Sequence, residues 1–110
     1  MRFFEVRFLD EADEFISQLD AKVIRKIFYN LDLAEQTNDP KLFKKLQKEI
    51  WEFRTLFAGH QIRLLTFWDK TDKSKTLIIA THGFIKKVDK APANEIERAV
   101  RLRTNYFNNK

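Results

Sequence analysis

The chain of 110 residues has no cysteine, 44% hydrophobic residues and a net charge of +5. Its length and composition indicate one globular domain over residues 1–110, and they exclude disulfides, thiolate metal ligands and a thiol nucleophile. No apolar run approaches the roughly 18 residues of a membrane span, and no signal peptide is recognisable, so a cytoplasmic protein is expected.

The charge is distributed unevenly along the chain. Residues 1–39 hold 5 basic and 9 acidic side chains, whereas residues 40–110 hold 16 basic and 7 acidic side chains. Such asymmetry favours a polyanionic partner for the basic part of the chain. The alternative is a solvated surface that is rich in lysine.

The acidic part of the chain predicts one strand and two helices. Apolar residues alternate over residues 3–9, which indicates a strand. Asp10 is placed to be the N-cap of a short helix that ends near Leu19, and Asp20 is placed to cap a second helix. Proline disfavours helix in the residue before it, so Pro40 and its neighbours end the second helix. The apolar residues of this helix recur at helical spacing: Val23, Ile24, Ile27, Phe28, Leu31 and Ala34.

The basic part predicts three strands and a last helix. Residues 41–48 are expected to be irregular or one helical turn. The three strands are expected at residues 48–57, 61–69 and 75–83. Pro92 is placed as the first residue of the last helix, which buries Ile96, Ala99, Val100 and Phe107. The order β-α-α-β-β-β-α predicts an α+β fold, a small, twisted, mostly antiparallel sheet with the helices packed on one face.

Two arginines fall in the middle of predicted strands. The two-residue period of a strand places Arg54 and Arg63 on one open face, with Glu52 beside them, and the helices on the other. On the last strand the same period places His82 and Ile79 on different faces of the sheet. One carboxylate leaves one guanidinium unpaired, and a guanidinium fork matches phosphate oxygens. The alternative is a simple cross-strand ion pair with Glu52.

The last strand has a basic exit. Lys86 and Lys87 are expected to clamp a phosphate at the rim of the arginine face, unless they only make a loop soluble. His82 could titrate near neutral pH or could be a packed structural histidine, and Gly83 allows a close backbone approach. His60 is expected to be an ordinary turn residue. The histidines and carboxylates lack the spacing of a metal site, and a glycine-rich phosphate loop is missing, so no metal or cofactor is expected.

Three segments and a helix carry a resemblance to a known family: Ile50-Trp51-Glu52-Phe53-Arg54, Ile62-Arg63-Leu64-Leu65, His82-Gly83-Phe84-Ile85-Lys86-Lys87, and the helix after Pro92 with Ala99. Over nearly its whole length the chain resembles the RelE/HigB toxin superfamily, and most of all its phage-derived branch of HigB-like toxins. The resemblance implies a compact α+β fold of RelE type. It also implies a toxin that a cognate antitoxin neutralises, often a helix-turn-helix protein. The implied activity is metal-independent cleavage of messenger RNA, usually on the ribosome.

The resemblance also assigns roles to residues. Arg54 and Arg63 match the strand arginines of the family, and Lys86 and Lys87 match its paired lysines. In such ribonucleases these groups orient the scissile phosphate and stabilise the charge that gathers as the 2′-oxygen attacks. The C-terminal catalytic tyrosine of the RelE branch has no secure counterpart, since Tyr106 lies on the final helix.

Several alternatives stay open at this point. The general acid and base are to be found among His82, Glu52 and a lysine. An alternative function is that of a ParE-like toxin, which inhibits gyrase without cutting RNA, and another is a non-catalytic module that binds RNA or an antitoxin. An apolar patch around Leu56, Leu65 and Phe67 is expected to receive an acidic, amphipathic segment of the antitoxin.

Overall fold

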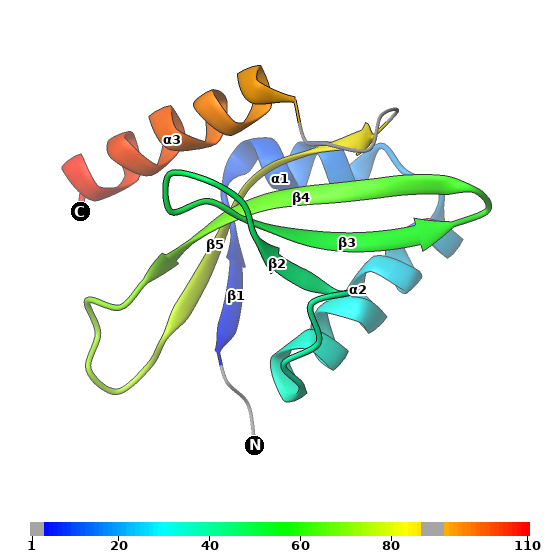
Figure 1. Ribbon diagram of the computed structural model, residues 1–110, viewed down its shortest axis with the longest axis horizontal. Coiled ribbons are helices and arrows are strands. Elements are labelled where there is room, and N and C mark those ends of the chain that lie inside the picture. Colours follow the sequence, from blue (N-terminus) through cyan, green and yellow to red (C-terminus); the bar gives the residue numbers. More distant parts are fainter. Residues whose placement is uncertain (1–3, 87–91) are drawn as a thin grey trace.

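The computed structural model describes residues 4–86 and 92–110, which form five strands and three helices. The elements are β1 (Glu5–Phe8), α1 (Asp10–Ser17), α2 (Ala21–Gln36), β2 (Phe43–Lys45), β3 (Trp51–Phe57), β4 (His60–Asp69), β5 (Leu77–Lys86) and α3 (Ala93–Asn108). The strands form one sheet in the order β1-β5-β4-β3-β2 (Figure 1). The pair β1–β5 is parallel and the other pairs are antiparallel. The predicted α+β class with a mostly antiparallel sheet is confirmed.

The segment 41–48 differs from its prediction, because it contains the edge strand β2. Phe43 lies opposite Phe53 of β3, and the backbone N–H of Arg54 donates to the carbonyl of Leu42 at 2.8 Å. A three-residue strand is too short to show a period of two. Its conformation is therefore fixed by pairing with β3, a contact between segments that the local pattern does not reveal.

The helix starts agree with the sequence in part. Asp20 is the N-cap of α2, as predicted, and its carboxylate accepts from the backbone N–H of Lys22 at 3.2 Å. Asp10 is not a cap, because Leu9 is the N-cap of α1 and Asp10 lies in its first turn. There the negative charge interacts favourably with the helix dipole. Pro92 is likewise the N-cap of α3 and not its first residue.

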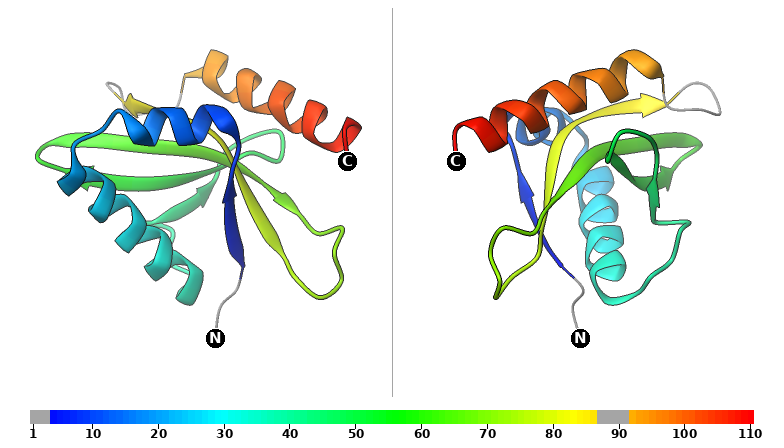
Figure 2. Two further views of the ribbon diagram at one scale, coloured as in Figure 1. Left: turned by 180° about the vertical axis from the view of Figure 1, so that it is seen from behind. Right: turned by 60° about the vertical axis from the view of Figure 1, so that its left-hand side comes forward.

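The three helices cover both faces of the sheet, which corrects the prediction that they share one face. Helices α1 and α2 lie in front of the strands in the left view of Figure 2, seen from behind, and pack on one face. Helix α3 packs on the other face. Its Ile96 and Ala99 contact a cluster with Leu65, Phe67 and Ile79. The apolar stripe of α3 needs an apolar partner, and these buried sheet residues supply it.

This packing also removes most of the apolar patch expected for an antitoxin. Leu65 and Phe67 are each 0% exposed under α3, and Leu56, near the far end of β3, remains 65% exposed. The sheet face that carries the arginines is therefore divided into an end covered by α3 and an end that α3 leaves open. We call these the covered end and the open end.

A tight turn sets the register of β3 against β4. Ala58 and Gly59 form the two-residue connection, and both have positive φ, 51° and 80°. Two left-handed central residues match the type I′ turn, whose twist suits a two-residue hairpin. The resulting register puts Arg54 directly opposite Arg63.

A bulge in β5 changes which face His82 occupies. Leu65 pairs with His82, but the next residue, Thr66, pairs with Ala80, so Thr81 has no partner across the strands. One extra residue reverses the alternation of the side chains that follow it. His82 therefore lies on the face that carries the two arginines, and the uninterrupted alternation assumed for residues 75–83 is wrong at this point.

Gly83 has a packing role that confirms the expected close approach. A Cβ atom at this position would collide with the ring of Phe15 in α1 and with the side chain of Leu64 in β4. The absence of a side chain lets α1 pack directly on β5. This glycine therefore serves the fold and not a phosphate.

Candidate functional site

The two strand arginines form the centre of the candidate site. Arg54 of β3 and Arg63 of β4 are direct cross-strand partners, and paired residues of an antiparallel sheet project from the same face. The prediction that they share a face is confirmed. Two positive charges so close repel each other unless an anion lies between them or beside them.

Glu52 supplies part of the compensating charge. One of its carboxylate oxygens lies 3.1 Å from Nε of Arg63, and the other lies 3.8 Å from Nε of Arg54. Glu52 is 2% exposed and Arg63 is 4% exposed, whereas Arg54 is half-buried. The face is therefore less open at Arg63 than predicted, because Glu52 holds this guanidinium inside the protein.

The guanidinium of Arg63 keeps hydrogen-bonding capacity for a ligand. Nη2 donates to Oε1 of Gln61 at 2.7 Å, and Nη1 donates to the carbonyl of Ile62 at 3.3 Å. The Nε–H group faces Glu52, with which Arg63 forms an ion pair. A guanidinium has five N–H groups, so the contacts with residues 4–86 and 92–110 leave two terminal N–H groups for an anion. Burial lowers the pKa of Arg63, Glu52 opposes that effect, and Arg54 adds to it. The group nevertheless stays protonated at neutral pH.

An open groove gives access to both arginines. Its volume is about 280 Å³, and its lining comprises Lys41, Arg54, Thr55, Leu56, Gln61 and Arg63. We call it the arginine groove. Lys41 was missed by the sequence reasoning, although it belongs to a basic segment. It reaches the groove because the carbonyl of Leu42 binds the backbone of Arg54 and holds this segment beside β3.

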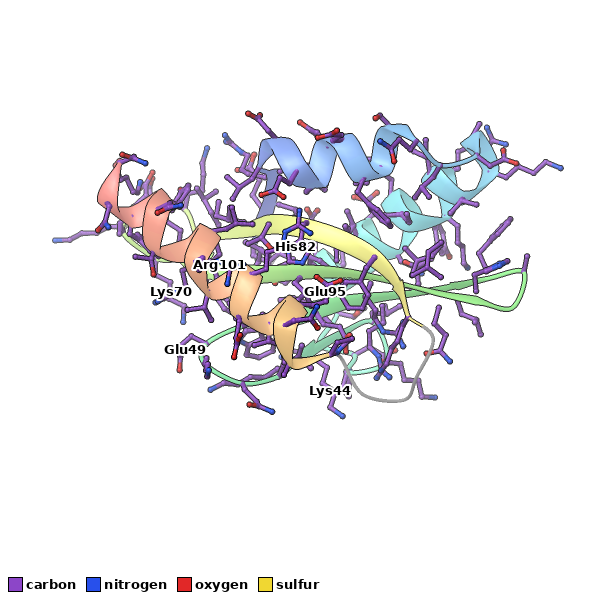
Figure 3. All side chains as sticks on the ribbon, turned by 90° about the horizontal axis from the view of Figure 1, so that it is seen from above. Lys44, Glu49, Lys70, His82, Glu95 and Arg101 are labelled. Carbon is purple, nitrogen blue, oxygen red and sulfur yellow. The ribbon has the colours of Figure 1, made fainter. Side chains whose placement is uncertain are left out.

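His82 lies elsewhere on the same face, beneath α3. Figure 3 shows His82 near Glu95 of α3. Its Nε2 lies 3.2 Å from Oε1 of Glu95, and its Nδ1 lies 3.0 Å from Oγ1 of Thr81. The side chain is 1% exposed and does not line the arginine groove. Burial lowers the pKa of His82, the charge of Arg98 lowers it further, and Glu95 opposes both. A neutral imidazole has one N–H and donates to one of its two partners at a time.

Of the two lysines predicted to clamp a phosphate, Lys86 is the last residue of β5. Lys86 is buried and lies opposite Gln61, a residue of the arginine groove, but it does not itself line that groove. Lys87 falls outside the described residues, so its role as a phosphate clamp stays a prediction.

Tyr106 is held at the covered end. Its hydroxyl donates to Oδ2 of Asp69 at 2.6 Å, and its ring contacts Phe67. Burial and the bond to Asp69 raise the pKa of Tyr106 to about 12. Asp69 is six residues beyond Arg63 on β4, roughly 20 Å along the strand. Tyr106 is therefore not placed to act at the arginines.

Two further findings limit the chemistry of the described residues. Within residues 4–86 and 92–110, no three His, Asp or Glu side chains are grouped so that they could hold a metal ion. No helix in this part of the chain is long and apolar enough to cross a membrane.

The fold is of RelE type. The structure is similar to a chain of the Escherichia coli RelBE toxin–antitoxin complex, with a TM-score of 0.53 and 12% sequence identity over 79% of this chain and 99% of that chain. At that identity the likeness shows the fold alone. Residues 14–104 match the family described as phage-derived protein Gp49-like, and the chain belongs to this family. The predicted RelE-type fold is confirmed by the RelBE likeness, and the match to the Gp49-like family agrees with the predicted phage-derived branch. No curated protein matches the chain.

Proposed function

We propose that this chain is the toxin of a type II toxin–antitoxin system and a metal-independent endoribonuclease that cleaves messenger RNA in the cytoplasm. The observation that carries the proposal is the cross-strand pair of Arg54 and Arg63 in an open groove with Lys41. Three cations around one concave surface suit a phosphodiester far better than a neutral ligand. Membership of the Gp49-like family and the RelE fold support the same class.

The groove suits the charge that develops during phosphodiester cleavage. The 2′-oxygen of the substrate bonds to the adjacent phosphorus as it loses its proton, and the bond to the departing 5′-oxygen breaks as that oxygen gains one. The products are a 2′,3′-cyclic phosphate and a 5′-hydroxyl. Arg54 and Arg63 stabilise the extra negative charge on the non-bridging oxygens, since Glu52 holds Arg63 in place before the substrate binds.

The partners follow from the class of protein. The RelBE structure is that of a toxin–antitoxin complex, and we extend this partnership to the present chain, with an antitoxin of the helix-turn-helix type. The ribosome is the proposed place of cleavage. An acidic antitoxin segment would compete with RNA for the cations around the arginine groove.

RNA cleavage by the purified chain tests the proposal. A defined messenger is incubated with the protein, with and without ribosomes, and the new 5′ ends are mapped by primer extension. Wild-type protein should cut, and Arg54→Ala should cut far more slowly. Arg101→Ala is the matched control, because this arginine is exposed on α3 outside the arginine groove (Figure 3).

Other outcomes would replace the proposal with a specific alternative. Inhibition of gyrase supercoiling with intact RNA would indicate a ParE-like toxin. RNA or antitoxin binding that depends on Arg54, with no cleavage under either condition, would indicate a non-catalytic binding module.

A further inference from the structure

An aromatic pocket lies on the opposite side of the sheet from the arginine groove. Its volume is about 510 Å³, which falls within the usual size of a small-ligand site. The lining comprises Phe4, Thr37, Asn38, Asp39, Pro40, Phe43, Lys44, Lys45, Trp51 and Trp68. Trp51 projects from the face of β3 opposite to Arg54, since the two are three residues apart on one strand.

The pocket has flat aromatic walls at right angles. The rings of Phe43 and Trp51 are stacked, with centroids 4.9 Å apart and an interplanar angle of 26°. Trp68 stands nearly perpendicular to Trp51, with centroids 5.7 Å apart and an angle of 78°. All three residues are only half-buried, so ring surface remains accessible from solution. Such surfaces accept any nucleobase, because every base has a π-face.

Lysines surround these walls. Lys44 and Lys45 line the pocket and are exposed, and the ammonium group of Lys70 lies 5.0 Å from the ring centroid of Trp68. Lys45 lies 3.8 Å from Glu49, but both side chains are more than half exposed. Solvent screens such a pair and leaves the lysine available to a phosphate. Aromatic faces with adjacent cations are typical of sites that bind single-stranded nucleic acid.

A short basic segment connects the pocket to the arginine groove. Lys41 lines the groove, and the residues that follow it lead along the β2 edge of the sheet to the pocket. Asp39 adds a carboxylate to the pocket, but its Oδ1 accepts from the backbone N–H of Lys41 at 2.9 Å and fixes this segment. Along β3, Trp51 and Arg54 are separated by roughly 10 Å.

We propose that the aromatic pocket binds one unpaired base of the RNA that the arginine groove cleaves. The RNA strand leaves the groove over the β2 edge, where Lys41, Lys44 and Lys45 contact its phosphates, and one base stacks in the pocket. The inference rests on the proposed function, because it takes RNA to be the substrate. The continuous path of lysines from groove to pocket favours RNA over a protein segment.

Intrinsic fluorescence gives a direct test, because the chain has two tryptophans and both line the pocket. Wild-type protein is titrated with a 2′-O-methyl oligoribonucleotide, which lacks the 2′-hydroxyl needed for cleavage. An abasic oligonucleotide of the same length, with the same number of phosphates, is the matched ligand. We expect quenching by the first and binding without quenching by the second. Equal fluorescence changes with both oligonucleotides would overturn the proposal.

Substitutions of several pocket residues test where on the protein the oligonucleotide binds. Trp51→Phe and Trp68→Phe each leave a single reporter, and we expect base-dependent quenching of each. Lys44→Ala and Lys45→Ala should each weaken binding a few-fold and reduce its salt dependence by about one counterion. Lys22→Ala is the control, because Lys22 lies at the other end of α2, roughly 22 Å from Thr37. An equal loss in the Lys22→Ala variant would contradict the proposed path.

Removal of one wall tests stacking itself. Phe43→Leu should weaken the base-bearing oligonucleotide roughly tenfold and leave the abasic one unchanged. Thermal melting checks that this variant folds. If Phe43→Leu does not fold, the comparison of the two oligonucleotides on wild-type protein still tests whether a base binds in the pocket. Equal weakening of both oligonucleotides by a folded Phe43→Leu variant would count against a base in the pocket.

The test separates this inference from the proposed function. RNA cleavage without base-dependent quenching would reject the pocket and keep the ribonuclease. Base-dependent quenching without cleavage would keep the pocket as an RNA site and reject the ribonuclease. Quenching by an acidic amphipathic peptide, and by neither oligonucleotide, would assign the pocket to a protein partner and overturn the inference.

Discussion

The open end and the covered end of one sheet face use charged residues in different ways. At the covered end, α3 provides partners for the ionisable groups: Glu95 lies beside His82, and Tyr106 donates to Asp69. At the open end, Arg54 and Arg63 share the carboxylate of Glu52 and line a groove with Lys41. At the covered end a helix supplies partners for the ionisable groups, whereas at the open end the charged groups border solvent.

The difference shows how a buried charge can indicate either structure or function. Burial makes an ionisable group costly unless it is paired, so the fully paired groups under α3 are explained by stability alone. Among the described residues, the cations of the arginine groove outnumber the anions and repel one another, which gives the fold no comparable benefit. An anionic ligand that removes this repulsion is therefore the simplest reason for the groove.

The largest expected effect comes from Arg63→Ala at the open end. RNA cleavage should fall by about 100- to 1000-fold, since a preorganised charge at the reacting phosphate is lost. Stability should fall by about 3–5 kcal/mol, because Glu52 stays buried without its nearest cation. Cleavage assays and denaturant unfolding measure the two effects. The double variant Glu52→Gln/Arg63→Ala should regain stability but not cleavage, and recovery of cleavage would show that Arg63 acts only through folding.

Arg54→Ala should separate activity from stability at the same end. We expect cleavage to fall by roughly 100-fold. Stability should change by less than about 1 kcal/mol, since Arg54 is half-buried and its contact with Glu52 is long. Arg101→Ala, measured in parallel, should change neither quantity. A folded Arg54→Ala variant with wild-type cleavage would remove this residue from the site.

His82→Ala should have the opposite profile, because His82 lies at the covered end. We expect stability to fall by about 2–3 kcal/mol, with cleavage per folded molecule unchanged. The pKa of His82 is lowered in the folded protein, so the unfolded chain binds the proton first. Wild-type stability should therefore be full above roughly pH 6.5 and should decrease as the pH falls below that value. A large loss of cleavage in a stable variant would instead make His82 an acid–base residue.

Tyr106→Phe should give a smaller effect, which depends on pH. We expect a loss of about 1–2 kcal/mol near neutral pH, because Asp69 loses a hydrogen-bond donor. Burial would raise the pKa of Asp69, but bonds from Thr71, Tyr106 and Lys110 outweigh burial and lower it. The stability that Asp69 provides should thus be present above roughly pH 4 and lost in more acidic solution.

The same variant can be followed at alkaline pH. Because the pKa of Tyr106 is raised to about 12, the folded protein favours the neutral phenol. Wild-type stability should decrease above roughly pH 10, where the unfolded tyrosine ionises, and Tyr106→Phe should lack this decrease. Thermal melting at acidic, neutral and alkaline pH checks both the acidic and the alkaline decrease in stability. An alkaline decrease of equal size in the variant would show that another group causes it.

Much of the open end could be predicted from the sequence, because it depends on short-range order. Alternation predicted β3 and β4, whereas His60, expected in the turn, is the first residue of β4, so the connection is one residue shorter than predicted. The placement of Arg54 and Arg63 on one face follows from these local features. The burial of Arg63 does not, since it depends on Glu52 and on the packing around it.

The sequence alone predicted β1, β3, β4, β5, the three helices and the shared face of the two arginines, because periodicity and turn geometry act within a few residues of each other. The tertiary structure decided which face α3 covers, how the bulge at Thr81 directs His82, and how Lys41 reaches the arginine groove. Each of these depends on contacts between segments distant in the chain, and such contacts leave no periodic pattern in the residues that make them.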